Sequence, residues 1–275
     1  YTQQFALEGL TARTRYELVV EGRIDADDES PATVTGGFRT APAPDAAAEV
    51  KFVVVTCGDY PRRDDPQRGH TIYTVMPQLD PDFFVHTGDI EYYDKPFPYA
   101  TTAAAARFKW NRIYSMPFQR DFHRQVASYF MKDDHDTLKN DCWPGQTYGD
   151  LTWDQGLAIF REQVPMGAKT YRTVRWGQDL QIWMVEGRDF RDPNTDPDGP
   201  EKSIWGEEQK RWFYDTVAAS DATFRVLISP TPMVGPDKKG KGDNHANPAF
   251  AHEGRELRQF IAEQENMFFI CGDRH

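Results

Sequence analysis

The chain has 275 residues, of which 39% are hydrophobic and 27% are charged, and its formal net charge at pH 7 is -11. This length is ample for a buried core, and no apolar run approaches the roughly 18 residues that a membrane-spanning helix needs. The acidic balance excludes a general binder of nucleic acid or anionic membranes, because no basic block offsets it. The sequence therefore predicts a soluble globular protein.

Three cysteines, Cys57, Cys142 and Cys271, form no disulfide framework, and their odd number leaves at least one thiol unpaired. The chain starts at Tyr1 without an initiator methionine or a signal peptide, and it stops at His275 while a motif is being completed. We therefore expect it to be the middle of a longer protein, with its last domain cut at the C-terminal end.

Residues 1–41 carry signals for β-strands. Residues 15–20 and 33–40 alternate apolar and polar side chains, with turn-forming residues between them. Two strands cannot bury a core alone, so we expect the last hairpin of an N-terminal β-sandwich, similar to a fibronectin type III or Ig-like module. The Ala/Pro-rich residues 42–49 are predicted to form a linker, because prolines hold a chain extended.

Residues 50–275 alternate short apolar runs with amphipathic segments, which indicates an α/β domain built from sheets layered with helices. Strands are expected at residues 50–56, 83–87, 126–131, 180–186, 224–229 and 267–271. Helices are expected at about residues 69–79, 101–114, 153–163, 205–219 and 252–264. In open α/β sheets the ligand site gathers at the carboxyl ends of the strands, so the residues that follow each strand are informative.

Possible metal ligands follow four of these strands. Asp89 comes directly after the strand at 83–87, and Tyr92 lies three residues later. An aspartate so placed can bridge two metal ions, and the tyrosine can give a hard oxygen donor to one of them. The other strand ends carry Cys57 and Asp59, then Asp133, Asp134, His135, Asp136, Asn140 and Asp141, and finally Asp273 and His275. One Gly-Asp pair is ordinary turn chemistry, but four such endings in order indicate a two-metal site.

These residues resemble the calcineurin-like metallophosphoesterase superfamily and, within it, the alkaline phosphatase D (PhoD-like) family. Residues 88–94 are similar to a motif of the purple acid phosphatases, in which the aspartate bridges both metals and the tyrosine binds ferric iron. The PhoD-like family adds a cysteine thiolate after the first strand, which Cys57 matches. Its further motifs resemble residues 187–193 and 206–212. The resemblance spans about residues 50–275 and implies a two-sheet αββα sandwich.

The resemblance implies a metal-dependent phosphoric-ester hydrolase, either a phosphomonoesterase or a phosphodiesterase, whose nucleophile is a hydroxide that bridges two metals. We expect Fe³⁺ with Ca²⁺, because Asp89 and the phenolate of Tyr92 are hard anionic donors and the second site is rich in oxygen. Zn²⁺, Mn²⁺ and Mg²⁺ are the alternatives. The expected ligands are Cys57, Asp59, Asp89, Tyr92, Asp134, Asn140, Asp273 and His275.

Two further residues are expected to act on the substrate. His135 is predicted to donate a hydrogen bond to the phosphate or to the leaving oxygen, and Arg188 to neutralise the equatorial oxygens. Arg188 and Arg191 equally fit surface ion pairs. Cys57 and Asp59 compete for the place of the first-strand ligand, and which aspartate of residues 133–136 binds metal stays open. Residues 243–245 and His252 fit either a substrate loop or a turn.

The strand at 224–229 is followed by Pro230 and Thr231, where many members of the superfamily have a histidine ligand. The second metal then has fewer nitrogen donors, which agrees with an oxygen-rich Ca²⁺ site. Two alternative functions remain, namely a hydrolase of phospholipid or teichoic-acid-like phosphodiesters and a metal-binding module with weakened catalysis. We expect a small-molecule or polymeric phosphate ester as substrate, no specific nucleic-acid binding, and a secreted, periplasmic or cell-surface location.

Overall fold

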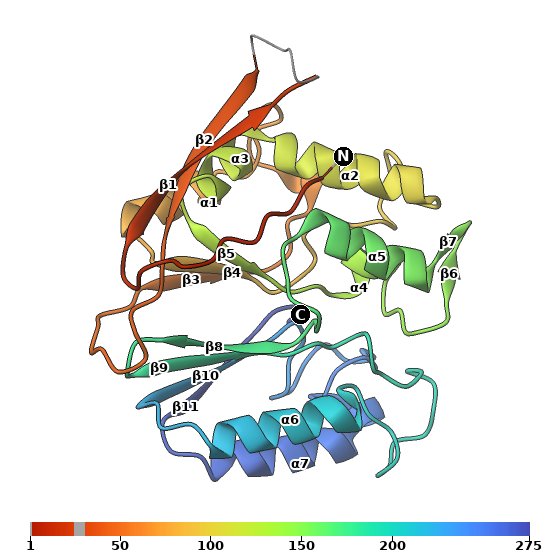
Figure 1. Cartoon of the computed structure of the whole chain (residues 1–275). Coiled ribbons are helices and arrows are strands. Elements are labelled where there is room, and N and C mark those ends of the chain that lie inside the picture. Colours follow the sequence, from red (N-terminus) through yellow and green to blue (C-terminus); the bar gives the residue numbers. More distant parts are fainter. Residues whose placement is uncertain (1, 25–30) are drawn as a thin grey trace.

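The computed structural model describes residues 2–24 and 31–275, and it contains two main β-sheets that lie face to face between two layers of helices (Figure 1). The first sheet is parallel and consists of β3 (Phe52–Val55), β4 (Phe83–His86) and β5 (Ala127–Phe130). The second has the order β11-β10-β9-β8 and consists of β8 (Arg172–Trp176), β9 (Leu180–Met184), β10 (Phe224–Ser229) and β11 (Met267–Cys271). In it, β9, β10 and β11 are parallel, and β8 is antiparallel to β9. The predicted αββα sandwich is confirmed.

The two sheets share an apolar core. Phe83 on β4 is fully buried, and its ring stacks on Phe52 of β3 at 5.0 Å between centroids. The same ring lies 4.5 Å from that of Trp176 on β8, in the opposite sheet. Every residue of β4 is buried, as expected for the central strand of a covered parallel sheet. This strand is therefore fixed on both faces where it delivers its C-terminal end to the loop of residues 87–94.

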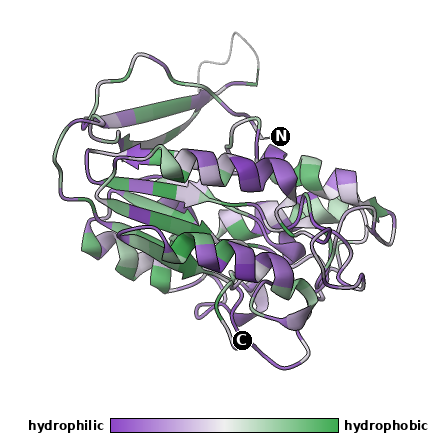
Figure 2. Ribbon diagram, turned by 90° about the horizontal axis from the view of Figure 1, so that it is seen from below, coloured by the Kyte–Doolittle hydropathy of each residue, from purple (hydrophilic) through white to green (hydrophobic). Residues whose placement is uncertain are grey.

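Helices cover both outer faces (Figure 1). The first sheet is covered by α1 (Ile72–Val75), α2 (Ala103–Ser115), α3 (Pro117–His123) and α5 (Trp153–Gln163), and the second by α6 (Gly206–Ala218) and α7 (Ala251–Ala262). Figure 2 shows hydrophobic residues gathered in the sheet strands, whereas the helices carry both hydrophobic and hydrophilic residues. On α6 the buried residues are Gln209, Phe213 and Val217, which recur every four positions and so form one inward stripe.

The hairpin of β1 (Arg15–Gly22) and β2 (Ala32–Arg39) is antiparallel and lies outside the sandwich. Gly36 allows a close approach there, because a Cβ atom would stand 2.6 Å from the carbonyl oxygen of Arg124. In the predicted linker, Pro42 is buried and the Ala46 carbonyl accepts a hydrogen bond from the Gln178 amide at 2.8 Å. The hairpin turn at 25–30 lies outside the described residues, and membership of a larger β-sandwich stays a prediction.

The six strands predicted between residues 50 and 275 are confirmed, although several are shorter than expected. The predicted helix at 69–79 is only α1 followed by η2 (Met76–Leu79), where Pro77 lies in a 3₁₀ turn. The sequence prediction missed β8, α3, the short α4 (Asp134–Thr137) and the hairpin of β6 (Thr147–Tyr148) and β7 (Leu151–Thr152). The other 3₁₀ turns among the described residues are η1 (Tyr60–Arg62) and η3 (Pro248–Phe250). β8 escapes detection because its sequence RTVRW contains no apolar run.

Candidate metal centre

The residues that follow β3, β4 and β11 share an unusual backbone conformation. Cys57, Asp89 and Asp273 have φ angles of 60°, 56° and 37°, in the left-handed region that non-glycine residues seldom adopt. Gly88, just before Asp89, has φ 115°, and a Cβ atom there would stand 2.6 Å from the amide nitrogen of Asp133. Such conformations gather at functional sites, where the surrounding structure must impose them.

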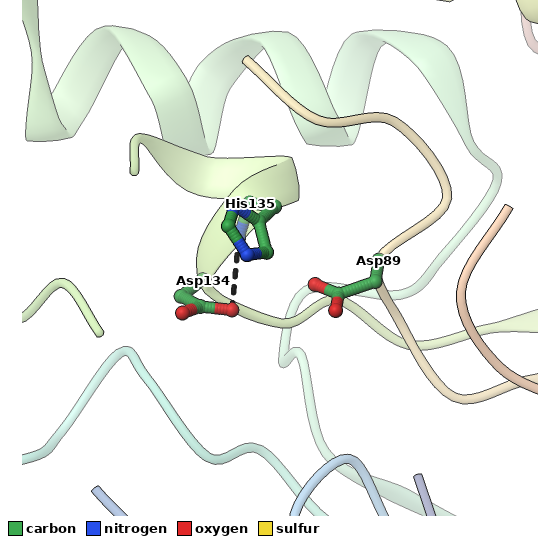
Figure 3. A group of neighbouring side chains, drawn as sticks. All are labelled: Asp89, Asp134 and His135. Atoms are coloured by element: carbon green, nitrogen blue, oxygen red, sulfur yellow. Dashed lines mark hydrogen bonds between the residues drawn. The ribbon is translucent and has the colours of Figure 1, made fainter. Parts of the chain in front are cut away.

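Asp89 stands at the centre of the group. It is 2% exposed, and its Oδ2 accepts a hydrogen bond from the Tyr92 hydroxyl at 3.2 Å and lies 3.6 Å from Cys57 Sγ. Ligand atoms of Asp89, Asp134 and His135 lie within 4.8 Å of one another, and these side chains face a common space (Figure 3). A second set with the same spacing joins Asp89 with Asp133 and Asp273. Five predicted ligands, Cys57, Asp89, Tyr92, Asp134 and Asp273, are thus brought together.

The donor set fits a cation. Asp89 Oδ1 and Asp133 Oδ2 are buried and have no hydrogen-bond partner among the described residues. Burial, together with the charges of Asp134 and Asp133, raises the pKa of Asp89 well above its ordinary value. Buried carboxylates in such proximity require a compensating positive charge. A metal ion bound by these two oxygens would supply that positive charge.

Asp136 holds the ligand-bearing loops together. Its carboxylate accepts hydrogen bonds from the amides of Asp89 at 2.6 Å, Ile90 at 2.7 Å, Glu91 at 2.9 Å and Asp133 at 3.0 Å. The loop after β4 is thereby fixed to the loop after β5. Both oxygens of Asp136 accept hydrogen bonds from backbone amides, so Asp136 fixes the backbone. Asp133 has an oxygen without a partner among the described residues, and Asp134 lies close to Asp89. Among residues 133–136, these two are therefore favoured as ligands.

His135 is oriented by a neighbour that the sequence reading did not assign. Its Nδ1 donates to Asp94 Oδ1 at 2.6 Å, and its ring lies 4.3 Å from that of Tyr92. Burial opposes the imidazolium, but the carboxylates of Asp134 and Asp94 raise the pKa of His135 above its ordinary value. With Nδ1 engaged, Nε2 is the atom left for a substrate.

A cleft of about 790 Å³ opens beside these residues. Of the predicted site residues, it is lined by Cys57, Asp59, Asp89, Tyr92, His135, Asn140, Asp273 and His275. Asn140 and His275 are exposed, and the imidazole Nε2 of His275 is 3.6 Å from Asp273 Oδ1. Asp134 and Arg188 are predicted site residues that do not line the cleft.

Cys57 and Asp59 have different surroundings. Asp59 Oδ2 forms an ion pair with Lys95 Nζ at 2.6 Å and with Arg62 Nε at 3.4 Å. Cys57 is exposed and instead contacts Asp89 directly, with its Sγ 3.6 Å from Asp89 Oδ2. The geometry therefore favours Cys57 as the first-strand ligand, and the role of Asp59 as a ligand stays a prediction.

Arg188 lies beneath the site. Its side chain is fully buried, with Nε donating to Asp133 Oδ1 at 2.5 Å and Nη2 to Asp243 Oδ2 at 2.9 Å. Arg191 is also buried and donates to the Asp243 carbonyl at 2.5 Å. The alternative of surface ion pairs is therefore wrong for both arginines, and contact between Arg188 and a substrate stays a prediction.

Several cleft residues were missed by sequence reasoning. Asp94, Lys95 and Lys241 all line the cleft. Asp94 lies within the motif at 88–94, so its position offered a signal, whereas nothing in the sequence around Lys241 reveals its partners. The loop of residues 243–245, considered as a substrate loop, is buried, and His245 Nε2 pairs with Glu253 Oε2 at 2.9 Å.

A family model described as PhoD-like phosphatase matches residues 52–275. The chain belongs to this family. The predicted resemblance is thereby confirmed over the region from β3 onward. No curated protein matches the chain. Among the described residues, no helix is long and apolar enough to cross a membrane.

Solved structures with this fold include PhoD and a plant purple acid phosphatase. The structure of PhoD is 18% identical, with a TM-score of 0.73, and the match covers 88% of this chain and 54% of that one. The purple acid phosphatase PPD1 from seeds of yellow lupin (Lupinus luteus) is 14% identical, with a TM-score of 0.57, and the match covers 85% of this chain and 39% of that one. The chain thus spans about half or less of these proteins, and at such identity the likeness shows the fold alone.

Proposed function

We propose that this chain is a metal-dependent phosphoric-ester hydrolase of the alkaline phosphatase type, acting on phosphomonoesters or phosphodiesters. One observation carries the proposal. Asp89 lines an open cleft, and its Oδ1 is buried without a hydrogen-bond partner in the described part of the chain. Oxygen and sulfur donors of Tyr92 and Cys57 surround the same carboxylate. Membership of the PhoD-like phosphatase family supports the assignment to phosphate esters.

Two cations would be held around Asp89. Cys57 and Tyr92 would serve one of them, for which Fe³⁺ is the expected ion, and Asp134 with Asn140 would serve the other, for which Ca²⁺ is expected. Asp273 and His275 would complete the set from the opposite sheet. When bound, such a pair stabilises charge on the phosphoryl oxygens and activates water as the nucleophile.

The protein's own groups would orient the ester and supply a proton. His135 lines the cleft and pairs with Asp94 at 2.6 Å, and it would donate from Nε2 to the leaving oxygen. Arg188 would act from below by fixing the carboxylate of Asp133.

The cleft opens to solvent and fits a small-molecule ester or one segment of a polymer. Phospholipid and teichoic-acid-like diesters are the alternative substrates, and a metal-binding module with weakened catalysis is the alternative from another class. Because members of the PhoD-like family are often secreted, we also propose a secreted, periplasmic or cell-surface location.

The test combines metal analysis with turnover of a chromogenic phosphomonoester and phosphodiester. Asp89→Asn should lose most bound metal and at least about 100-fold in turnover, since even residues that only support metal ligands cost 10–100-fold. Cys57→Ala should lose metal, whereas Asp59→Ala should keep it. Asp150→Asn, an exposed position, is the matched control. Wild-type metal content and turnover in Asp89→Asn would overturn the proposal.

A further inference from the structure

A lysine ammonium group lies among three carboxylates at the wall of the cleft. Lys241 Nζ is 2.9 Å from Asp141 Oδ1, 3.3 Å from Asp273 Oδ2 and 3.5 Å from Asp243 Oδ2. Its side chain is 12% exposed, and it comes from the loop between β10 and η3. Its three partners follow β5, precede η3 and follow β11, so the ammonium joins segments from both sheets.

The carboxylates themselves have the arrangement of a cation site. Oxygens of Asp134, Asp141 and Asp243 lie within 4.8 Å of one another. Asp243 is fully buried, and its Oδ1 has no hydrogen-bond partner within the part of the chain that the structure describes. Arg188 compensates Asp243 from one side at 2.9 Å and approaches Asp134 at 3.8 Å. On the other side of the cluster, Lys241 forms ion pairs with Asp141 and Asp243.

We propose that Lys241 is a tethered cation that fills, from the side of Asp141 and Asp243, an additional cation position beside the candidate metal centre, built by Asp134, Asp141 and Asp243. Without this side chain, the same oxygens would form a binding site for a free divalent cation that prefers hard oxygen ligands, of the class of Ca²⁺.

The physical basis is charge compensation. A buried carboxylate is costly unless it is paired, and removing one partner of a buried pair leaves an uncompensated charge. Ammonium is a compact point charge with three donors, and the oxygens of Asp141, Asp243 and Asp273 surround that of Lys241. Carboxylate oxygens are also the donors that Ca²⁺ prefers.

A consequence concerns Asp273. Its Oδ2 lies 3.3 Å from Lys241, while Asp273 also belongs to the set around Asp89. Lys241 is therefore a positioning residue for that carboxylate, and it ties the loop after β10 to the metal centre. This role requires only the carboxylates and does not depend on the proposed hydrolysis.

The experiment titrates metal-stripped protein with Ca²⁺ by calorimetry and measures thermal unfolding without metal. Lys241→Ala should bind one more Ca²⁺ per chain than wild type, and its midpoint without metal should fall by several degrees and recover with Ca²⁺. Lys241→Arg should keep the wild-type stoichiometry. Asp141→Asn added to Lys241→Ala should abolish the additional site.

Lys239→Ala is the matched control, because Lys239 is exposed on the same loop and forms no ion pair among the described residues. If Lys241→Ala does not fold, Lys241→Met replaces it in the unfolding measurement, where a lower midpoint than wild type is expected. An unchanged Ca²⁺ stoichiometry in a folded Lys241→Ala variant would overturn the proposal. So would a raised KM for a phosphate ester with unchanged stability, because Lys241 would then serve the substrate. A wild type that binds no Ca²⁺ would count against the metal centre, while the difference between variants still decides this proposal.

Discussion

The acidic side chains of this protein differ in what satisfies them. Asp136 accepts four backbone amides, and Glu253 accepts hydrogen bonds from Ser203, the Ile204 amide and His245. Asp89 instead keeps one buried oxygen without a partner among the described residues. The first two carboxylates hold chain segments in place, and the third is a candidate ligand for an external cation. All three side chains are buried, so burial alone does not separate a structural acid from a candidate ligand.

Glu253 gives a pH dependence with a definite sign. Burial opposes its ionisation, but the hydrogen bond and charge of His245 lower the pKa of Glu253 from 4.5 to about 2. A depressed folded-state pKa adds stability that is present above the unfolded value and is lost as the pH falls. The contribution should therefore disappear between pH 4.5 and 2, by roughly 3 kcal/mol for a shift of this size. Urea unfolding from pH 7 to 2 measures it.

The Glu253→Gln variant isolates this contribution. It should be less stable than wild type at pH 7 by about 1–3 kcal/mol, because an amide cannot accept all the donors that face it. Its stability should also change less between pH 4.5 and 2. Glu263→Gln, at an exposed position at the end of the same helix, should follow the wild-type curve. Parallel pH curves for Glu253→Gln and wild type would contradict the assignment.

At the scale of elements, the packing of α5 on α4 sets the position of the site. α4 carries Asp134 and His135, and it lies against Gly156 of α5. A Cβ atom at Gly156 would overlap the carbonyl oxygen of Thr137 in α4. Only glycine lets the two helices approach this closely, so the placement of two site residues depends on a third that has no chemistry of its own.

Gly156→Ala should therefore destabilise the protein, although helix propensity alone favours alanine over glycine by about 1 kcal/mol. Overpacking of this kind costs typically about 1–3 kcal/mol, and the displaced α4 should also weaken metal binding. Thermal unfolding and metal content measure the two effects. Gly167→Ala meets no atom within 4 Å and should leave both unchanged. A more stable Gly156→Ala variant would show that the helices can move apart without loss.

The elements that the sequence predicts are those with an unbroken apolar signal. β4 and β10 are read directly from their apolar runs, and because parallel strands end at one edge, Asp89 follows as a candidate ligand. β8 is not read, because its two arginines interrupt the pattern. Lys241 and Arg188 reach partners 100 and 55 positions away, and no local signal encodes such pairings. Sequence thus predicts the ligands at strand ends, whereas their counter-charges emerge only from the packing of the two sheets.

At the scale of the whole molecule, buried ion pairs join the two sheets beneath the cleft. Lys132, after β5, pairs with Glu186 at 2.9 Å and with Asp189 at 2.7 Å, both after β9. In the opposite direction, Arg188, after β9, pairs with Asp133, after β5. The two sheets are thus held by apolar packing in their middle and by charges at the edge where the site lies. Relative movement of the sheets would separate Asp89 from Asp273, so these pairs also define the geometry of the candidate metal centre.

Arg188→Met tests this arrangement. It removes the cation that compensates Asp133 and Asp243, and breaking a buried pair by loss of one partner costs about 3–5 kcal/mol. We expect the midpoint of urea unfolding to fall accordingly. Turnover of a phosphate ester should fall mainly through kcat, because the metal ligands lose their spacing while the substrate loses no direct contact.

Arg188→Lys sharpens the outcome, since lysine keeps the charge but lacks the fork that reaches two carboxylates at once. It should recover part of the stability and little of the turnover. A direct contact with the phosphate, as the sequence predicts, gives the opposite pattern, with near-normal stability in Arg188→Met and a raised KM. We expect a loss of stability and a lower kcat in Arg188→Met, because the guanidinium is fully buried. Two of its nitrogens already donate hydrogen bonds to Asp133 and Asp243.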